Sequence, residues 1–409
     1  MANFNTPTPM DSFSRMFAAK FDERTIQHVP TGFLAFFGLP GVSETLYSDD
    51  SEAVDIDIVR ANGQKLAAMV HRGMSSDPSD VATITAGKYS SFSRKWPLIE
   101  VLNSINSNRL LSRIAGEPVS GGFTRVERNR DYAYNLRNDA ILRSIRTHNY
   151  LAAQSILTGV QPAIIGTTND ALKYDFLRDS SLSLSSLTAW DADGATPMAD
   201  IDGACELVES VGNAIPNFFG IDSETWATLI QDTTFQTLAD NRRFELIEVS
   251  TNNPVPPEYA RYVAAGWIPR GRLRTLEGRT LWVFNYNGMY TDPYTGTLTR
   301  YLPRGYAFIT DINARRDRYF GPEDHLPVTG DMRQWYADMF GVNMDAPPLY
   351  QKTAEAVSGG IITMDMFHFD AWRAPDNKSL YLRTQSAPIY ATTQTDAIAV
   401  MSGLLTDED

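Results

Sequence analysis

The stretch TRVERNRDYAYNLRNDAILRSIRTHNYLAAQSILTG, residues 124–159, decides the fold of this chain. Neither Pro nor Gly interrupts it before Gly159, and Thr124 with Glu127 forms the T-x-x-E pattern of a helix capping box. Gly159 is the kind of residue that commonly ends a helix. The stretch therefore predicts one uninterrupted helix over residues 124–158, about 52 Å long at 1.5 Å per residue.

Two patterns run along this helix. Apolar and aromatic residues recur at helical spacing, which predicts that the second half packs along one side; they are Tyr134, Ile141, Ile145, His148, Ala152 and Ile156. Arginines outnumber acids; the arginines are Arg125, Arg128, Arg130, Arg137, Arg143 and Arg146, and the acids are Glu127, Asp131 and Asp139. Such a face is either solvated with some ion pairs, or it contacts acidic neighbours or DNA.

The sequence before the helix changes character several times. Residues 1–30 lack periodicity and read as an arm that needs another surface to become ordered. TGFLAFFGLPG, residues 31–41, predicts a short buried element, and the alternation in residues 54–59 predicts a strand. Residues 71–94 are too polar to form a core, and they form either a surface loop or an extended hairpin lying across a neighbouring subunit.

The sequence after the helix predicts short helices and strands in mixed order, which indicates an α+β fold. Helical spacing covers residues 201–211, and Asp222 or Ser223 could cap a helix that continues through Ile230. Strands are expected at residues 244–249, 281–286, 361–372 and 380–391, with a hairpin turn marked by Pro293 and Gly296. Residues 330–360 read as a local insertion.

Composition excludes some classes of protein. A formal charge of −13 argues against a protein that grips phosphates over a broad surface. The single cysteine, Cys205, rules out an intrachain disulfide and suits a reducing compartment. The N-terminus has no features of a secretory signal and no apolar run is long enough to cross a membrane, so we expect synthesis in the cytoplasm.

No motif in the sequence predicts a catalytic, cofactor-binding or metal-binding residue. Gly87-Lys88 lacks the rest of a phosphate-binding loop, and Cys205 has no nearby histidine. Asp55 with Asp57 fits a solvated sheet face better than a carboxylate pair. On a strand, His368 and Asp370 share a face whereas Asp365 lies on the other, so these three do not converge on a metal.

Two C-terminal stretches carry a resemblance to a known family. WVFNYNGMYTDPYTGTLTRYLPRGYAFIT, residues 282–310, and YLRTQSAPIYATTQTDAIAVMSGL, residues 381–404, resemble major capsid proteins of phage lambda type. The order of GFLAFFG, a polar loop and an arginine-studded helix ending in Leu-Thr-Gly is also similar. This order spans nearly the whole chain, although residues 330–360 match poorly.

The resemblance implies the tailed-phage major capsid fold named after the Hong Kong 97 phage. In that fold an N-terminal arm, an extended loop, a peripheral domain with a long spine helix and an axial domain build hexamers and pentamers. Carried onto this chain, the arm is residues 1–30, the extended loop 71–94, the peripheral domain 31–70, 95–179 and 361–409 with its spine helix at 124–158, and the axial domain 180–360.

The implied function is that of a structural head protein without enzyme activity or cofactor, assembled in the bacterial cytoplasm into a virion shell around double-stranded DNA. Its expected partners are other copies of itself, a scaffolding protein, a portal protein and, where one exists, a decoration protein, with weak or repulsive contact to DNA and none to a membrane. Some proteins of this fold form covalent cross-links through a lysine, but Lys88 and Lys95 are not assigned that role. The alternatives are the shell of a bacterial nanocompartment of the same fold, or a soluble enzyme with an unrecognised site.

Overall fold

The computed structural model describes residues 31–37, 45–46, 53–59, 89–106, 124–162, 173–185, 187–240, 244–246, 255–321, 356–357, 362–363, 367–373 and 379–406. Its helices are α3 (Arg125–Thr158), α4 (Pro197–Ser210), α5 (Ser223–Gln231), α6 (Thr233–Asp240) and α7 (Ala260–Ala264), with short 3-10 turns η1 (Gly32–Phe36), η4 (Ser180–Leu182), η5 (Pro257–Tyr259) and η7 (Thr395–Ala397). Helices and strands alternate without a regular βαβ order, so the predicted α+β class is confirmed.

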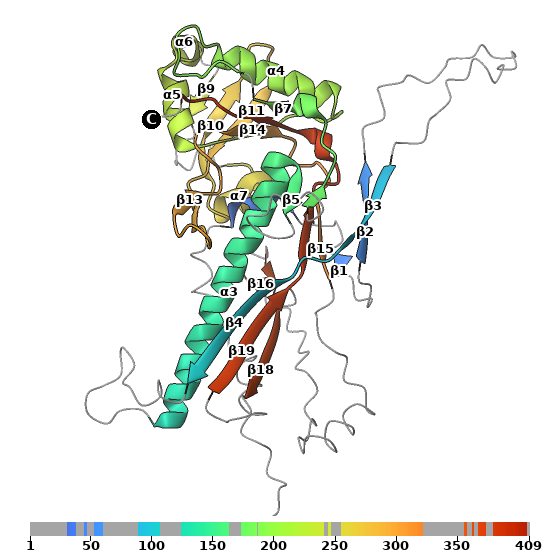
Figure 1. Ribbon diagram of the computed structural model, residues 1–409. Helices are drawn as coiled ribbons and strands as arrows, with labels where there is room; N and C mark the ends of the chain where they lie inside the picture. The colour runs from blue at the N-terminus through green and yellow to red at the C-terminus, as the bar shows by residue number, and fades with distance from the viewer. Residues whose placement is uncertain are drawn as a thin grey trace, which may run out of the picture.

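A seven-stranded mixed sheet forms the largest part of the molecule (Figure 1). Its strands are, in spatial order, β7 (Ser183–Leu184), β21 (Ile398–Met401), β14 (Ala307–Thr310), β8 (Phe218–Ile221), β11 (Thr280–Asn285), β10 (Ile268–Arg274) and β9 (Phe244–Leu246). Alternate residues serve opposite faces of this sheet. Phe219 and Ile309 pack toward α4, whereas Phe218 and Phe308 pack toward η1 and α3, so both faces are covered.

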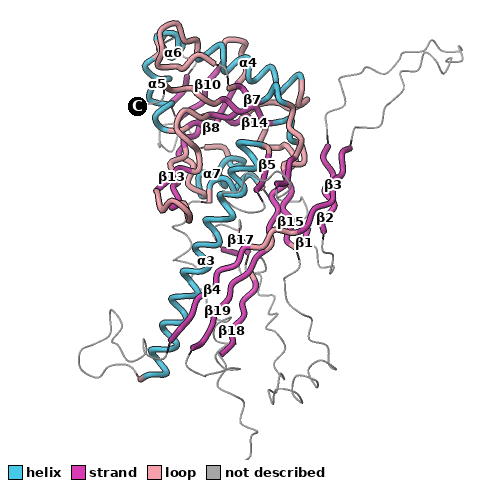
Figure 2. Tube along the Cα trace, viewed as in Figure 1, coloured by secondary structure: helices cyan, strands magenta, loops and turns pink. Residues whose placement is uncertain are grey.

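Helix α3 confirms the predicted long helix, and it runs from beneath the seven-stranded sheet along a second sheet (Figure 2). That sheet consists of β18 (His368–Arg373), β19 (Ser379–Ser386) and β4 (Ile99–Asn106), all antiparallel to their neighbours. Leu382 of β19 and Ile105 of β4 are buried, and Asn103 donates to the Leu136 carbonyl of α3.

The predicted stripe of α3 is buried over the second half of the helix, and the packed surface is wider than the stripe. The predicted stripe residues from Ile141 onward are buried, but so are residues on both flanks of the stripe, among them Ala140, Ser144, Asn149, Leu151, Ala153, Ser155 and Leu157. The sequence pattern marks the most apolar side and misses the polar and small residues that are also enclosed. Elements far apart in the sequence pack on this part of the helix: η1 contacts Asn149, and β20 contacts Ser155.

The short element predicted at residues 31–41 is confirmed as η1, and it is clamped between α3 and the sheet. The Asn149 Oδ1 of α3 accepts from the backbone N–H groups of Phe33 (3.0 Å) and Leu34 (3.3 Å). Asn149 Nδ2 donates to the Tyr286 hydroxyl (3.1 Å), which in turn accepts from the Gly32 N–H (3.2 Å). A Cβ at position 32 would lie 2.2 Å from the Tyr286 ring, so only glycine fits there.

Smaller sheets complete the fold. Strands β1 (Thr45–Leu46), β15 (Asp317–Phe320) and β20 (Pro388–Ala391) form one of them, and paired strands form the others: β2 (Ala53–Val59) with β3 (Tyr89–Lys95), β5 (Val160–Pro162) with β6 (Lys173–Asp175), β12 (Met289–Thr291) with β13 (Leu298–Arg300), and β16 (Ala356–Val357) with β17 (Ile362–Thr363). The β2–β3 pair lies beside β15 at one side of the molecule (Figure 1). Ile56 and Ile58 of β2 are buried in one apolar cluster with Phe176 and Ile389.

Two strand pairings bear on the domain division that the resemblance implied, which stays a prediction. Residues 398–401, expected in the peripheral domain with the rest of 361–409, form β21 inside the seven-stranded sheet, because β21 pairs with β14 and β7. Residues 89–94, expected within the extended loop, belong to β3 and pair with β2 of the same chain. Residues 71–88 and nearly all of the expected insertion at 330–360 lie outside the described residues.

Acid should destabilise the folded chain through His148, the stripe residue that contacts Tyr390. Its Nδ1 lies 2.6 Å from the Tyr390 hydroxyl among buried aromatic rings, and burial lowers its pKa from 6.5 to about 3. Because the folded pKa is below the unfolded one, the unfolded state binds the proton first as pH falls through 6.5, and stability is lost from there down to pH 3.

We expect a loss of about 2 kcal/mol from this group between pH 7 and pH 5. Urea unfolding at both pH values, in the wild-type chain and in His148→Gln, measures it. The difference in stability between the two pH values should shrink by that amount in the variant. An equal loss in both proteins would show that His148 does not titrate on unfolding.

Candidate functional site

The residues considered from the sequence as chemical groups do not form a reactive site in the described part of the chain. Cys205 is buried on α4 against the sheet, and burial raises the pKa of its thiol to about 12. A thiol with such a pKa is no nucleophile at neutral pH. Its role is that of a small core residue.

The other candidates gain no support as ligands. His368 and Asp370 lie on β18, and Asp55 and Asp57 lie on β2, but their side chains are not among the described ones. Gly87, Lys88 and Asp365 lie outside the described residues, and Lys95 ends β3 opposite Ala53. Within the described ranges, no three His, Cys, Asp or Glu side chains gather as a metal site would require, and no helix has the length and apolarity to cross a membrane.

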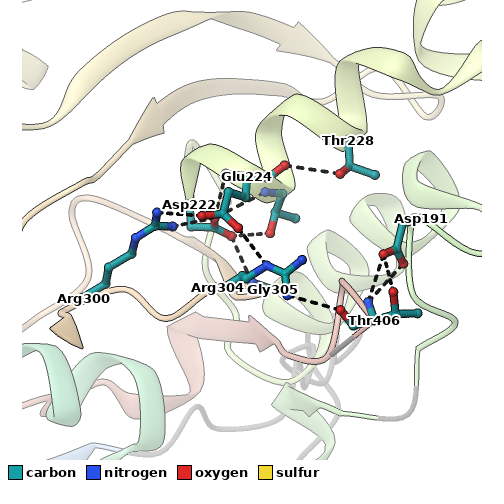
Figure 3. A network of polar contacts seen from close by, with 9 residues as sticks. Asp191, Asp222, Glu224, Thr228, Arg300, Arg304, Gly305 and Thr406 are labelled. Carbon is teal, nitrogen blue, oxygen red and sulfur yellow. Dashed lines mark hydrogen bonds and ion pairs between the residues drawn. The ribbon is translucent and has the colours of Figure 1, made fainter. Parts of the chain in front are cut away.

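The densest polar cluster in the described chain surrounds the start of α5 (Figure 3). Asp222, fully buried, is the N-cap that the sequence predicted, and its Oδ1 accepts from the N–H groups of Glu224 (2.8 Å) and Thr225 (3.3 Å). Its Oδ2 accepts from the Thr225 hydroxyl and from the Gly305 N–H (3.1 Å). Both carboxylate oxygens are therefore engaged in holding backbone.

Glu224 extends this cluster to the segment between β13 and β14. Its two carboxylate oxygens receive Arg300 Nη2 at 2.6 Å and Arg304 Nε at 2.7 Å. Partial desolvation pushes the pKa of Glu224 upward, but the hydrogen bonds and charges of Arg300 and Arg304 outweigh it and hold that pKa below its usual value. Arg300 Nη1 also lies 3.7 Å from Asp222 Oδ1.

The cluster also fixes the C-terminal segment. Arg304 Nη1 donates to the Thr406 carbonyl (3.3 Å), and the Thr406 N–H and hydroxyl donate to the Asp191 carboxylate. The Thr406 hydroxyl keeps the pKa of Asp191 below its usual value. Four segments far apart in the sequence are thus joined by charged hydrogen bonds, as Figure 3 shows.

We call these residues the α5 network: Asp191, Asp222, Glu224, Arg300, Arg304 and Thr406. It contains no group of raised reactivity, and its carboxylates all face cations, hydroxyls or backbone N–H groups. The arrangement positions chain segments and does not carry out chemistry. The sequence identified only Asp222, because the capping pattern is local; the RYLPR spacing of Arg300 and Arg304 gives no sign of the acid that both contact.

Three of the six arginines of α3 have described side chains. Arg143 pairs with Asp139 one turn earlier at 2.7 Å, Arg137 is buried, and Arg146 is exposed. Arg143 and Arg146 fit the interpretation of a solvated face with some ion pairs, whereas the buried Arg137 does not. The side chains of Arg125, Arg128 and Arg130 are not among the described ones.

The fold itself defines the class of protein. The chain superposes on the crystal structure of a protein assigned as the capsid protein of a prophage of E. coli CFT073, with a TM-score of 0.54 at 16% sequence identity, covering 96% of this chain and 98% of that one. At this identity the likeness shows the fold alone, which is that of tailed-phage capsid proteins. The expected fold is confirmed.

The sequence then places the chain within that class. It belongs to the family of phage major capsid protein E, whose model matches residues 50–338, more than half of the chain. The protein is therefore a structural subunit of a phage head shell, as the resemblance in the sequence implied.

Weaker likenesses exist to other shell proteins. They include the satellite phage P4 procapsid (TM-score 0.39, 11% identity, covering 97% of this chain and 98% of that one) and the SrpI encapsulin complex of Synechococcus elongatus PCC 7942 (TM-score 0.41, 9% identity, 97% of each chain). At these TM-scores neither carries an argument for this chain. Among curated proteins, none matches the sequence.

The α5 network should contribute to stability mainly through its buried member. Asp222→Ala leaves the Thr225 and Gly305 N–H groups without their acceptor, which should cost about 3 kcal/mol. Glu224→Gln breaks ion pairs of a side chain that is 45% exposed and should cost under about 1 kcal/mol. Denaturant unfolding of both variants measures the difference, and equal costs would contradict the division of roles within the network.

Proposed function

We propose that this chain builds the icosahedral head of a tailed phage as hexamers and pentamers around double-stranded DNA. The observation that carries the proposal is the match to the phage major capsid protein E family over residues 50–338. A closed shell with six-fold and five-fold positions is the arrangement that the resemblance in the sequence implied for this fold.

The shape of the subunit supports this use. The subunit is elongated (Figure 1). The seven-stranded sheet lies at one end, α3 and the β18–β19–β4 sheet extend to the other, and the β2–β3 pair lies to one side. Such a shape leaves much of the molecule's side surface available to neighbours. In this proposal the seven-stranded sheet corresponds to the axial domain. Helix α3 and the β18–β19–β4 sheet, together called the α3 unit, correspond to the peripheral domain. The β2–β3 pair corresponds to the base of the extended loop.

The proposed partners follow the same reasoning. A scaffolding protein would guide assembly, a portal protein would occupy one vertex, and a decoration protein is a further partner where the phage encodes one. We assign neither a covalent cross-link nor an enzyme activity to the chain. Assembly would take place in the host cytoplasm.

Contact with the packaged genome is proposed to be weak or repulsive. The chain has a net charge of −13, and several arginines are committed to protein acids: Arg143, Arg279, Arg300, Arg304 and Arg315 all form ion pairs. An arginine bound to a carboxylate has little to gain from a phosphate. A genome that must leave the head benefits from walls that do not hold it.

Two measurements on the purified full chain test this proposal. Electron microscopy should show closed shells or ring-shaped capsomers, whereas a stable monomer would contradict the shell function. Capsomers titrated with a fluorescent DNA duplex at physiological salt should show no appreciable binding. Tight binding that weakens steeply as salt rises would reassign the arginine face of α3 to nucleic acid.

A further inference from the structure

The β12–β13 hairpin lies at the edge of the molecule (Figure 1), and it carries three exposed apolar or aromatic side chains. Tyr294 is 68% exposed, Leu298 is 69% exposed and Met289 is 40% exposed. Thr291 pairs with Leu298 and Met289 pairs with Arg300, so Met289 and Leu298 lie on the same face of the hairpin. Tyr294 lies in the turn between the strands. We call Met289, Tyr294 and Leu298 the hairpin tip.

The opposite face of the hairpin is firmly held. Tyr290 packs between Tyr150 of α3 (ring centroids 5.2 Å apart) and Tyr301 (4.9 Å), and the Tyr301 hydroxyl donates to the Arg146 carbonyl. On the same face as the tip, Arg300, the strand partner of Met289, is fixed by Glu224 of the α5 network. The hairpin thus contacts both the long helix and the start of α5.

The turn itself is also fixed. Asp292 Oδ1 accepts from the N–H groups of Tyr294 (2.7 Å) and Thr295 (3.2 Å), and Gly296 adopts a φ of 69°, which suits glycine. A surface ordered in advance loses little conformational entropy when a partner docks on it. An exposed tyrosine on such a support is typical of the residues that dominate binding energy at protein interfaces, and exposed apolar area beside it marks an interaction site.

Charge indicates which partner docks there. Copies of a chain with net charge −13 repel one another, and contact is least costly where the surface carries little charge. Residues 289–300, MYTDPYTGTLTR, hold one acid and one base. Asp292 is engaged in the turn, and Arg300 is paired with Glu224.

We propose that the hairpin tip is a docking surface for a second copy of this chain, with Tyr294 and Leu298 as its anchoring side chains. The inference rests on the proposed shell function and adds the residues through which copies associate. The α5 network and the Tyr150–Tyr290–Tyr301 stack fix the direction in which the tip points. The hairpin is therefore an interaction element that the subunit core positions.

The test compares assembly by Leu298→Glu with that by Leu276→Glu, which introduces the same charge at a 46% exposed leucine in the turn after β10. Both variants should keep the wild-type melting temperature, since both side chains are exposed. The protein concentration needed for assembly, measured by light scattering, should be at least about tenfold higher for Leu298→Glu than for Leu276→Glu. Equal effects of the two substitutions would overturn the proposal.

Two further measurements cover the remaining outcomes. Tyr294→Ser, a milder change in the turn, should weaken assembly in the same direction, and a folded Tyr294→Ser protein that assembles like wild type counts against the proposal. A photo-reactive phenylalanine at position 294 should cross-link two copies of the purified full chain. If it cross-links no second copy within assembled shells, the tip serves a different partner and the inference fails, while the proposed shell function stands. A wild-type chain that never assembles would contradict both.

Discussion

Asn149 and the aromatic rings around it form the junction on which the subunit depends. The Asn149 amide holds η1 through two backbone N–H groups and reaches Tyr286 at the end of β11, so helix, turn and sheet meet at one side chain. Around it, Phe36 packs edge-on against Phe218 and Trp267. The free-energy cost of burying a polar amide in such a core is offset here because its oxygen and its nitrogen both form hydrogen bonds.

This junction explains how an elongated subunit stays rigid. One apolar cluster contains Ile145 and Ile156 of α3, Phe308 of the seven-stranded sheet and Tyr390 of β20. The seven-stranded sheet and α3 therefore share one hydrophobic core. Surface elements can then be held at fixed angles to the core. The β12–β13 hairpin, stacked on Tyr150 of α3 and paired to Glu224 of α5, takes its position from both units. For a shell subunit, fixed angles between contact surfaces set the curvature of the assembly.

Local signals in the sequence predicted local structure well. The unbroken run to Gly159 gave α3 within one residue, the Asp222 cap gave α5, and Pro293 with Gly296 gave the β12–β13 turn. What failed depends on partners far away in the chain. The sequence around Ser155 does not predict its contact with Tyr390 of β20, and the sequence around residue 398 does not predict that the last strand returns to the seven-stranded sheet. The α5 network was missed for the same reason, since Glu224 and its arginines are separated by more than seventy residues.

The central claim is that α3 and the seven-stranded sheet unfold as one unit because they share a core. Native-state hydrogen exchange on the dissociated full-length subunit tests it most directly. The amides of residues 140–157 and those of β8, β11 and β14 should exchange through a single opening reaction whose free energy equals that of global unfolding. Exchange of the α3 amides through a separate opening of lower free energy, while the sheet stays protected, would contradict the claim.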